Sequence, residues 1–97
     1  MYARIVTVQT RPGQLDPASA LFCELALPFA QAQPGFRQAL LLTDADTGQA
    51  ITITLWDSEQ SQRASEADGR FMQQVSQVAP LLAQPPMMQG MQVRALV

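Results

Sequence analysis

The sequence predicts an α+β fold of the ferredoxin-like class, with strands and helices in the order βαββαβ. Three observations predict it. A hairpin signal occupies the centre of the chain at 34–58, a helical segment stands on either side of it, and strand-like segments stand at both ends. This order folds as one antiparallel sheet with its helices on one face. A length of 97 residues is typical of one domain, so we expect residues 1–97 to form a single unit.

The first strand and the first helix occupy the N-terminal third of the chain. We expect the strand at Tyr2–Thr10, where β-branched residues are frequent. After a Pro-Gly turn, Asp16 is a suitable N-cap and Pro17 suits the first helical position. The helix should run to about Gln33, with apolar residues on more than one face. Pro28 should kink it, because proline removes one backbone hydrogen bond.

The central hairpin combines two strand-like runs with a turn. The runs are Phe36–Thr43 and Ala50–Trp56, and in the second, which is rich in β-branched residues, aliphatic residues alternate with threonines and the tryptophan. Asp44, Asp46 and Gly48 between them are turn residues, since aspartate can bond to nearby backbone and glycine can take a positive φ. This favours turn chemistry for the two aspartates over a cation site.

Pairing Gln49 with either aspartate gives the hairpin the same two faces. One face is fully apolar and carries Leu40, Leu42, Ile51, Ile53 and Leu55. The other is smaller and partly polar, and carries Ala39, Leu41, Thr43, Thr52, Thr54 and Trp56. No charge interrupts either strand between Arg37 and Asp57, so neither face is expected to be fully solvated.

The C-terminal part should hold one interrupted helix and the last strand. Ser58 is a suitable N-cap, and Asp68-Gly69 should interrupt the helix. Apolar residues at helical spacing continue it to about Pro80. Met87–Val97 is then predicted to form the fourth strand.

Composition points to a second copy of the chain as partner. Hydrophobic residues make up 47% and charged residues only 14%, against about 25% charged in an average protein. The chain's own two helices can cover one sheet face, and nothing remains to cover the other. We therefore expect a homodimer.

Other partners and compartments are disfavoured. The net charge is −2 and the six basic residues are scattered arginines, so no nucleic-acid surface is expected. The longest apolar stretch, 18–32, is broken by Glu24 and is too short for a membrane span. A single cysteine, Cys23, and a start without a signal-peptide pattern favour the cytoplasm. Cys23 is expected to be a buried structural residue, since no basic neighbour is visible.

With this order of elements, the chain resembles the antibiotic-biosynthesis-monooxygenase-like (ABM-like) domains of the dimeric α/β-barrel superfamily. The resemblance covers nearly the whole chain. It is carried by the βαββαβ order, by the helix Leu15–Phe29, by Gln33–Phe36 before the second strand, and by Ile53–Trp56 before an acidic helix start. It implies that two protomers close one barrel through their sheets, and that each can hold a small ligand between sheet and helices.

The resemblance also suggests site residues. Trp56 stands where several family oxygenases have a tryptophan, and cofactor-free relatives bind aromatic substrates with tryptophan, asparagine, arginine or tyrosine. In this chain the candidates for a ligand site are Trp56, Tyr2, Arg4 and Arg37, together with the threonines that share the face of Trp56, Thr52 and Thr54. Haem-degrading relatives use a histidine ligand and an asparagine, and both residue types are absent here. No cofactor and no metal are therefore expected.

Alternatives stay open for most of these residues. Trp56 can line a pocket or close the core at the end of a strand. Arg4 and Arg37 can orient an acidic phenol or carboxylate, or extend to solvent from the sheet edges, which we favour. The methionines Met72, Met87, Met88 and Met91 can line a ligand or fill a core or interface.

Two functions are compatible with this inventory. The first is a homodimeric cofactor-independent monooxygenase that binds a compact aromatic or quinone-like ligand. No residue is assigned as catalytic, because without histidine or lysine the proton must pass to a carboxylate, to Tyr2 or to the substrate itself. The second is a non-catalytic dimeric binding or interaction module that retains only the fold.

Overall fold

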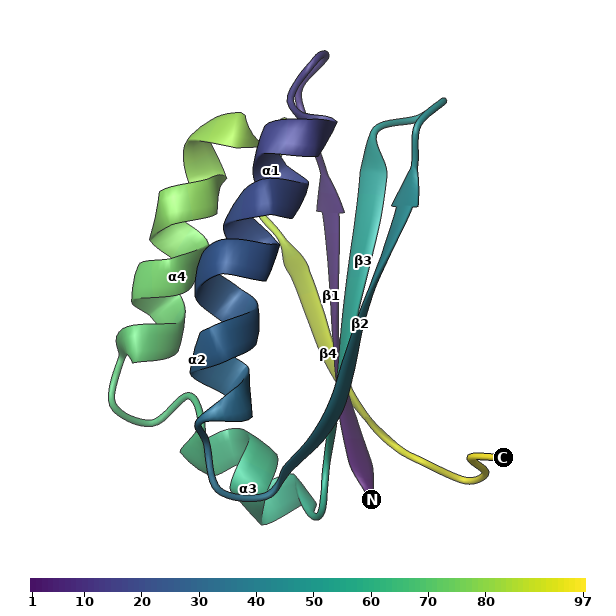
Figure 1. Cartoon of the computed structure of the whole chain (residues 1–97), viewed down its shortest axis with the longest axis vertical. Coiled ribbons are helices and arrows are strands. Elements are labelled where there is room, and N and C mark those ends of the chain that lie inside the picture. Colours follow the sequence, from purple (N-terminus) through teal and green to yellow (C-terminus); the bar gives the residue numbers. More distant parts are fainter.

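The computed structural model describes residues 1–97 and confirms the ferredoxin-like α+β fold (Figure 1). Its elements, in chain order, are β1 (Tyr2–Gln9), α1 (Leu15–Leu21), a π-helical turn η1 (Phe22–Ala26), α2 (Leu27–Gln31), β2 (Phe36–Asp44), β3 (Gln49–Trp56), α3 (Glu59–Ala64), α4 (Arg70–Val78), a 3₁₀ turn η2 (Ala79–Leu81) and β4 (Met87–Gln92).

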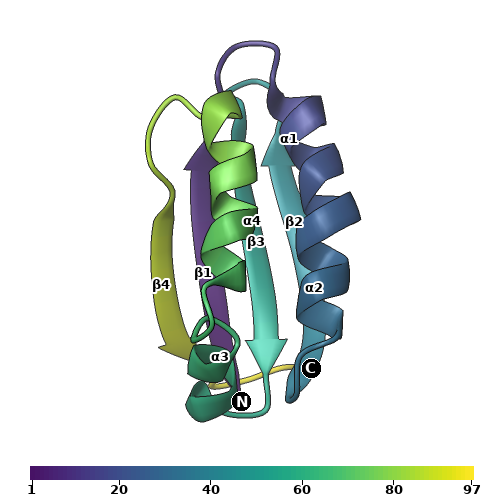
Figure 2. The same ribbon diagram turned by 90° about the vertical axis from the view of Figure 1, so that its left-hand side faces the viewer.

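The four strands form one antiparallel sheet in the order β2-β3-β1-β4. All helices lie on the same face of this sheet. Figure 2 looks onto that face, where α1–η1–α2 runs over β2 and β3 while α4 runs over β1 and β3. In Figure 1 nothing covers the opposite face, and the C-terminal end extends away on that side.

The hairpin has the faces that the alternation predicts. Asp44 pairs with Gln49, so Leu40 lies opposite Ile53 and Leu42 opposite Ile51. The turn forms as expected, since the Asp44 carboxylate accepts a bond of 2.9 Å from the backbone N–H of Asp46.

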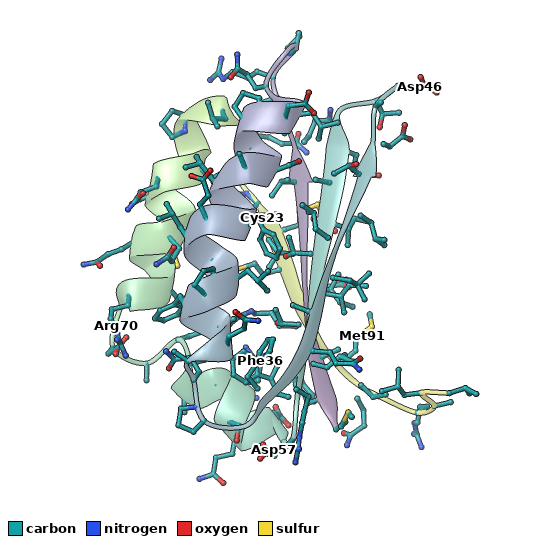
Figure 3. The ribbon with its side chains drawn as sticks, viewed as in Figure 1. Cys23, Phe36, Asp46, Asp57, Arg70 and Met91 are labelled. Carbon is teal, nitrogen blue, oxygen red and sulfur yellow. The ribbon has the colours of Figure 1, made fainter.

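The small, partly polar face is the one that meets the helices. β1 adds Arg4 opposite Thr54 and Val6 opposite Thr52, so these side chains share that face. The fully apolar face is the uncovered one. Leu42 there keeps 48% of its surface exposed, and Met91 points away from the helices (Figure 3).

The first helix begins earlier than the capping residues predict. Gln14 is in the N-cap position, so the prediction of Asp16 as N-cap is wrong. Asp16 lies in the first turn instead, where a carboxylate still stabilises the helix dipole. No side chain caps this end.

Pro28 causes a wide turn in the middle of this helix. The backbone N–H of Leu27 bonds to the carbonyl of Phe22, five residues back, which is the π-helical spacing. Proline has no N–H and its ring clashes with the carbonyl four residues before it, so the chain widens just ahead of Pro28. Cys23 lies in this turn and is exposed, so the expectation of a buried cysteine is wrong.

The second helical region follows the prediction. The Ser58 hydroxyl caps α3 by accepting the N–H of Ser61, and Gly69 precedes α4 with φ of 83°. The last strand is shorter than expected, because its ladder with β1 ends at Gln92. None of the helices is both long and apolar enough to span a bilayer.

Candidate functional site

An apolar cavity of about 110 Å³ lies between the sheet and the helices. Fourteen of its 19 lining residues are hydrophobic. The helices contribute Phe22, Leu25, Phe29, Phe71, Val75 and Val78, and the sheet contributes Val6, Val8 and Leu41 among others. A somewhat larger cavity of about 150 Å³ with a similar lining holds a benzene molecule, so this one has room for at most a single aromatic ring.

The wide turn at Pro28 shapes one wall of this cavity. Phe22, Leu25 and Ala26 of η1 all line it. A π-helical turn rotates the residues that follow it relative to a regular helix, and such turns are frequent at functional sites. Pro28 thus directs more apolar side chains toward the sheet than one regular stripe would.

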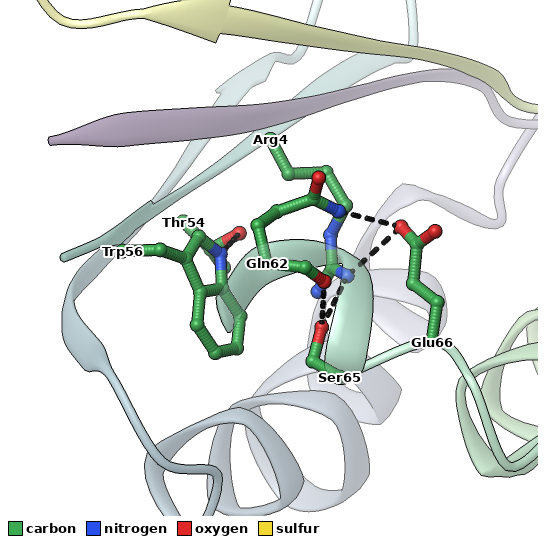
Figure 4. A network of polar contacts seen from close by, with 6 residues as sticks. All are labelled: Arg4, Thr54, Trp56, Gln62, Ser65 and Glu66. Carbon is green, nitrogen blue, oxygen red and sulfur yellow. Dashed lines mark hydrogen bonds and ion pairs between the residues drawn. The ribbon is translucent and has the colours of Figure 1, made fainter. Parts of the chain in front are cut away.

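Arg4 is the charged group in the wall of the cavity. It is only 6% exposed, and its Nη1 donates to the Ser65 hydroxyl and to the Glu66 carboxylate, both at 3.1 Å (Figure 4). The Nε and Nη2 nitrogens have no acceptor within the protein. The expectation that Arg4 extends to solvent is therefore wrong, because α3 brings its partners to it.

Two aromatic rings lie close to the Arg4 guanidinium. Its Cζ atom is 4.2 Å from the ring centre of Phe71 and 5.5 Å from that of Trp56. Burial lowers the pKa of Arg4, and the hydrogen bond and charge of Glu66 act in the opposite direction. Arginine stays protonated in proteins, so Arg4 brings a permanent positive charge to an apolar cavity.

Glu66 compensates this charge only in part. Gln62 donates to its Oε1 at 2.8 Å, while the Glu66 side chain keeps 37% of its surface exposed. Water therefore screens the carboxylate, whereas the guanidinium faces the cavity. The network fixes one nitrogen of Arg4 and leaves three N–H donors free.

Trp56 lies outside the cavity wall and inside the core. It is fully buried, its Nε1 donates to the Thr54 hydroxyl at 3.0 Å, and its ring meets Phe36 edge-on at 5.7 Å. Its N–H thus has an internal partner. Trp56 contacts Arg4 and Thr54, and those two residues line the cavity.

The other candidates divide between the cavity and the surface. Thr52 lines the cavity with Thr54. Tyr2 packs on β4, where its ring leaves no room for a side chain at position 90, and it does not line the cavity. Arg37 is exposed in the irregular stretch of β2 between Phe36 and Gln38.

Arg37 instead acts on Asp57 at the start of α3. The Ser61 hydroxyl lowers the pKa of Asp57 most, and the charge of Arg37 adds to this effect. The structure therefore brings Arg4, Thr52 and Thr54 together at the cavity and leaves Tyr2, Arg37 and Trp56 outside it.

Gln74 is a polar lining residue that the sequence-based prediction missed. Its Oε1 atom is fully buried and has no hydrogen-bond partner. Such an atom costs about 1–3 kcal/mol of stability. A signal was present, because Gln74 shares a helical stripe with Phe71, Val75 and Val78, and those three are apolar.

The methionines do not line the cavity. Met72 is exposed on α4, and Met87 and Met91 are exposed on the uncovered sheet face. No three side chains among histidine, cysteine, aspartate and glutamate are grouped so that they could hold a metal ion.

Solved structures with the same fold come from several bacteria. A monooxygenase of Streptomyces coelicolor in complex with nanaomycin D has a TM-score of 0.85 and 23% identity, over 99% of this chain and 89% of its own. A variant of SnoaB, a cofactor-independent oxygenase of Streptomyces nogalater, has a TM-score of 0.80 and 21% identity, over 99% and 96%. A protein of Mycobacterium tuberculosis has a TM-score of 0.79 and 21% identity, over 98% and 96%. At these identities the likeness establishes the fold.

The family assignment rests on the sequence. A comparison with curated proteins gave no match. The sequence model of the antibiotic biosynthesis monooxygenase family, in contrast, matches residues 1–77. This range includes β1 to β3, α1 to α3, all of α4 except its last residue, and every polar residue of the cavity wall. The chain therefore belongs to the antibiotic biosynthesis monooxygenase family.

Proposed function

We propose that the protein binds a compact phenolic or quinone-like ligand in the cavity, with an oxygen of the ligand on Arg4. One observation carries this proposal: a buried guanidinium with free N–H donors faces an apolar space of ring size. Ligand sites of this kind combine an apolar wall with a few polar groups that orient the ligand.

The charge of Arg4 selects the ionised form of such a ligand. A phenolate beside an arginine is stabilised by charge and by hydrogen bonds, so the pKa of the phenol falls on binding. The apolar wall acts in the opposite direction. With three N–H donors available and a carboxylate partner that water screens, we expect the guanidinium to have the larger effect.

The reaction that follows from this binding is cofactor-independent monooxygenation. An electron-rich phenolate can give electrons to O₂ directly. A ring C–H para to the hydroxyl becomes a carbonyl, one oxygen atom enters the product, and the other leaves as water together with the ring and hydroxyl hydrogens. The substrate supplies all the electrons, so no external reductant is needed.

The protein's part in this reaction is binding and charge stabilisation. Arg4 holds the phenolate oxygen, and the apolar wall orients the ring and excludes water. A substrate that binds as an anion has already lost its proton. This suits a chain without histidine or lysine, in which no general base lines the cavity.

The family relationships support this function. The chain is a member of the antibiotic biosynthesis monooxygenase family, the Streptomyces coelicolor structure is a monooxygenase with nanaomycin D bound, and SnoaB is a cofactor-independent oxygenase.

We propose further that the protein acts as a homodimer in the cytoplasm. The uncovered face of the sheet is apolar, with Leu40, Leu42, Met87 and Met91 each at least 42% exposed. A two-fold related copy offers the same face in return, so both are covered at once. In this arrangement each protomer keeps its own cavity on the helix side.

Titration of the protein into para-nitrophenol tests the binding proposal. This single-ring phenol becomes coloured on ionisation, so absorbance reports its protonation state. At a pH below its pKa in water, wild-type protein should raise the fraction of phenolate, and binding should saturate. Arg4→Met should remove this effect, because the charge is gone while a long apolar side chain still fills the space.

Arg37→Met is the matched control, since Arg37 is exposed and outside the cavity. It should behave as wild type. Thermal unfolding of each variant shows that it is folded. Binding of para-nitrophenol in its neutral form, or equal binding by the Arg4 variant, would contradict the proposal.

Measurement of oxygen uptake distinguishes a monooxygenase from a non-catalytic binding module. Purified protein treated with a chelator should consume one O₂ per phenol and yield 1,4-benzoquinone and water. Saturable binding of the phenol without any oxygen uptake above the uncatalysed rate would favour a binding module.

A further inference from the structure

We propose that Gln74 selects ligands that carry a second, un-ionised hydroxyl group. This inference rests on the proposed function and defines the ligand of the same cavity more closely. Arg4 presents only donors, so it binds an ionised or carbonyl oxygen. Gln74 presents an acceptor, so it requires a ligand O–H or N–H.

The first observation is the isolation of the Gln74 carbonyl. Its Oε1 is buried, has no hydrogen-bond partner, and belongs to a residue that lines the cavity. Buried polar atoms in folded proteins nearly always have partners, and an exception calls for a bound water or ligand as the partner. The two neighbours on its helical stripe, Phe71 and Val78, are apolar and cannot supply one.

The second observation is the position of Gln74 relative to Arg4. Phe71 precedes Gln74 by three residues on α4, so the two side chains are neighbours on the helix surface. The Phe71 ring is the one that covers the Arg4 guanidinium, at 4.2 Å. The donor on the sheet and the acceptor on the helix therefore face the same cavity from opposite layers.

A ligand that satisfies both residues has two different polar groups on one ring system. An anionic or carbonyl oxygen meets Arg4, and a hydroxyl meets Gln74. A plain quinone offers only acceptors and would leave Oε1 unpaired. The cavity thus prefers hydroxylated rings, such as quinols and hydroxyquinones, over the unsubstituted quinone or an O-methylated ring.

Benzoates separate the two contacts experimentally. Their carboxylate occupies Arg4, and a second substituent then probes Gln74. Calorimetric titration would compare para- and meta-hydroxybenzoate with their methoxy counterparts. For at least one of the two isomers, wild-type protein should bind the hydroxy compound about threefold to tenfold more tightly, as expected for one neutral hydrogen bond.

Gln74→Leu should abolish this preference and leave the affinity for the methoxy compounds within about twofold. The variant should fold, since the substitution removes an unpaired buried acceptor. Gln77→Leu is the matched control: the same substitution on the same helix, at an exposed position outside the cavity. It should keep the wild-type preference.

Three results would overturn the inference. A hydroxy preference that survives in Gln74→Leu places the acceptor elsewhere. A wild-type preference for the methoxy compounds means that the amide presents its NH₂ to the ligand. Equal affinity of wild-type protein for the hydroxy and methoxy compounds means that the Gln74 carbonyl does not accept a hydrogen bond from the ligand. If para-nitrophenol still binds as an anion in these cases, the proposed function stands. If neither it nor any benzoate binds, both proposals fall.

Discussion

Arg4 is the single charged side chain among the residues that line the cavity. Its surroundings cannot be read from neighbouring residues, because Ser65 and Glu66 lie 61 and 62 positions away. An arginine in a strand pattern ordinarily extends to solvent. Here the end of α3 supplies a hydroxyl and a carboxylate, and the residue becomes the polar centre of the cavity.

Trp56 gives a second prediction at the level of single residues. Trp56→Phe removes the indole N–H from the Thr54 hydroxyl and leaves a small void behind Arg4. We expect the free energy of unfolding to fall by about 1–3 kcal/mol. Because Trp56 does not line the cavity, para-nitrophenol binding should fall less than in Arg4→Met. Denaturant unfolding and the absorbance titration measure the two effects.

A stable Trp56→Phe variant that has lost ligand binding would mean that the indole contacts the ligand directly. The sequence left the pocket and core roles of Trp56 equally open, since alternation shows which face a strand residue is on but not what lies above it. The packing of α3 and α4 decides which residues of that face reach the cavity. Thr52 and Thr54 do, and Trp56 at the strand end does not.

Among the elements, the hairpin and the second helical region were the most predictable. Alternation from Gln49 to Trp56 determines which side chains share a face, while the choice of Asp44 as the partner of Gln49 came only with the structure. Ser58 caps α3 as its residue type predicts. The sequence did not show that the first helix would contain a π-helical turn. Pro28 indicates a disturbance, but whether the helix bends or widens depends on how Phe22 and Leu25 pack against the sheet.

The turn between α2 and β2 gives a prediction for an element. Gly35 has φ of 85°, and a Cβ there would lie 2.5 Å from Ser61 Cβ and 2.6 Å from Asp57 Oδ1. Gly35→Ala should therefore suffer both backbone strain and a clash with the start of α3. Gly13 has a similar φ of 78° but open space around it, so Gly13→Ala is the matched control.

We expect Gly13→Ala to lose about 1–2 kcal/mol of stability through backbone strain alone. Gly35→Ala should lose at least about 1 kcal/mol more, because the neighbours must shift. Chemical denaturation of both variants measures the difference. Equal losses would show that α3 does not hold the turn in this position.

For the whole molecule, the main consequence of the fold is a sheet with one apolar face uncovered. An interface of the obligate kind buries about 2,000 Å² or more. Unfolding should then depend on protein concentration, since dissociation and unfolding are linked. The fold class follows from the order of the elements, but the partner of this face is inferred from composition and from the exposed apolar residues, and it stays a prediction.

Leu42→Glu tests this dimer, because it places a charge on the uncovered face. Sedimentation equilibrium should show a dimer for wild type and a shift toward monomer or unfolded chain for this variant. Met72→Glu is the control, since Met72 is 53% exposed on α4, on the helix side. A wild-type protein that is monomeric and stably folded at micromolar concentration would contradict the dimer.

The position of a bound ligand tests the central claim most directly. Isotope-filtered NMR on protein labelled at its valine and leucine methyl groups, with bound para-nitrophenol, reports which methyl groups lie near the aromatic ring. We predict contacts to Val6, Val75 and Val78, which line the cavity between the sheet and the helices. Contacts to Leu40 and Leu42 on the uncovered face, without any to the three valines, would contradict the account.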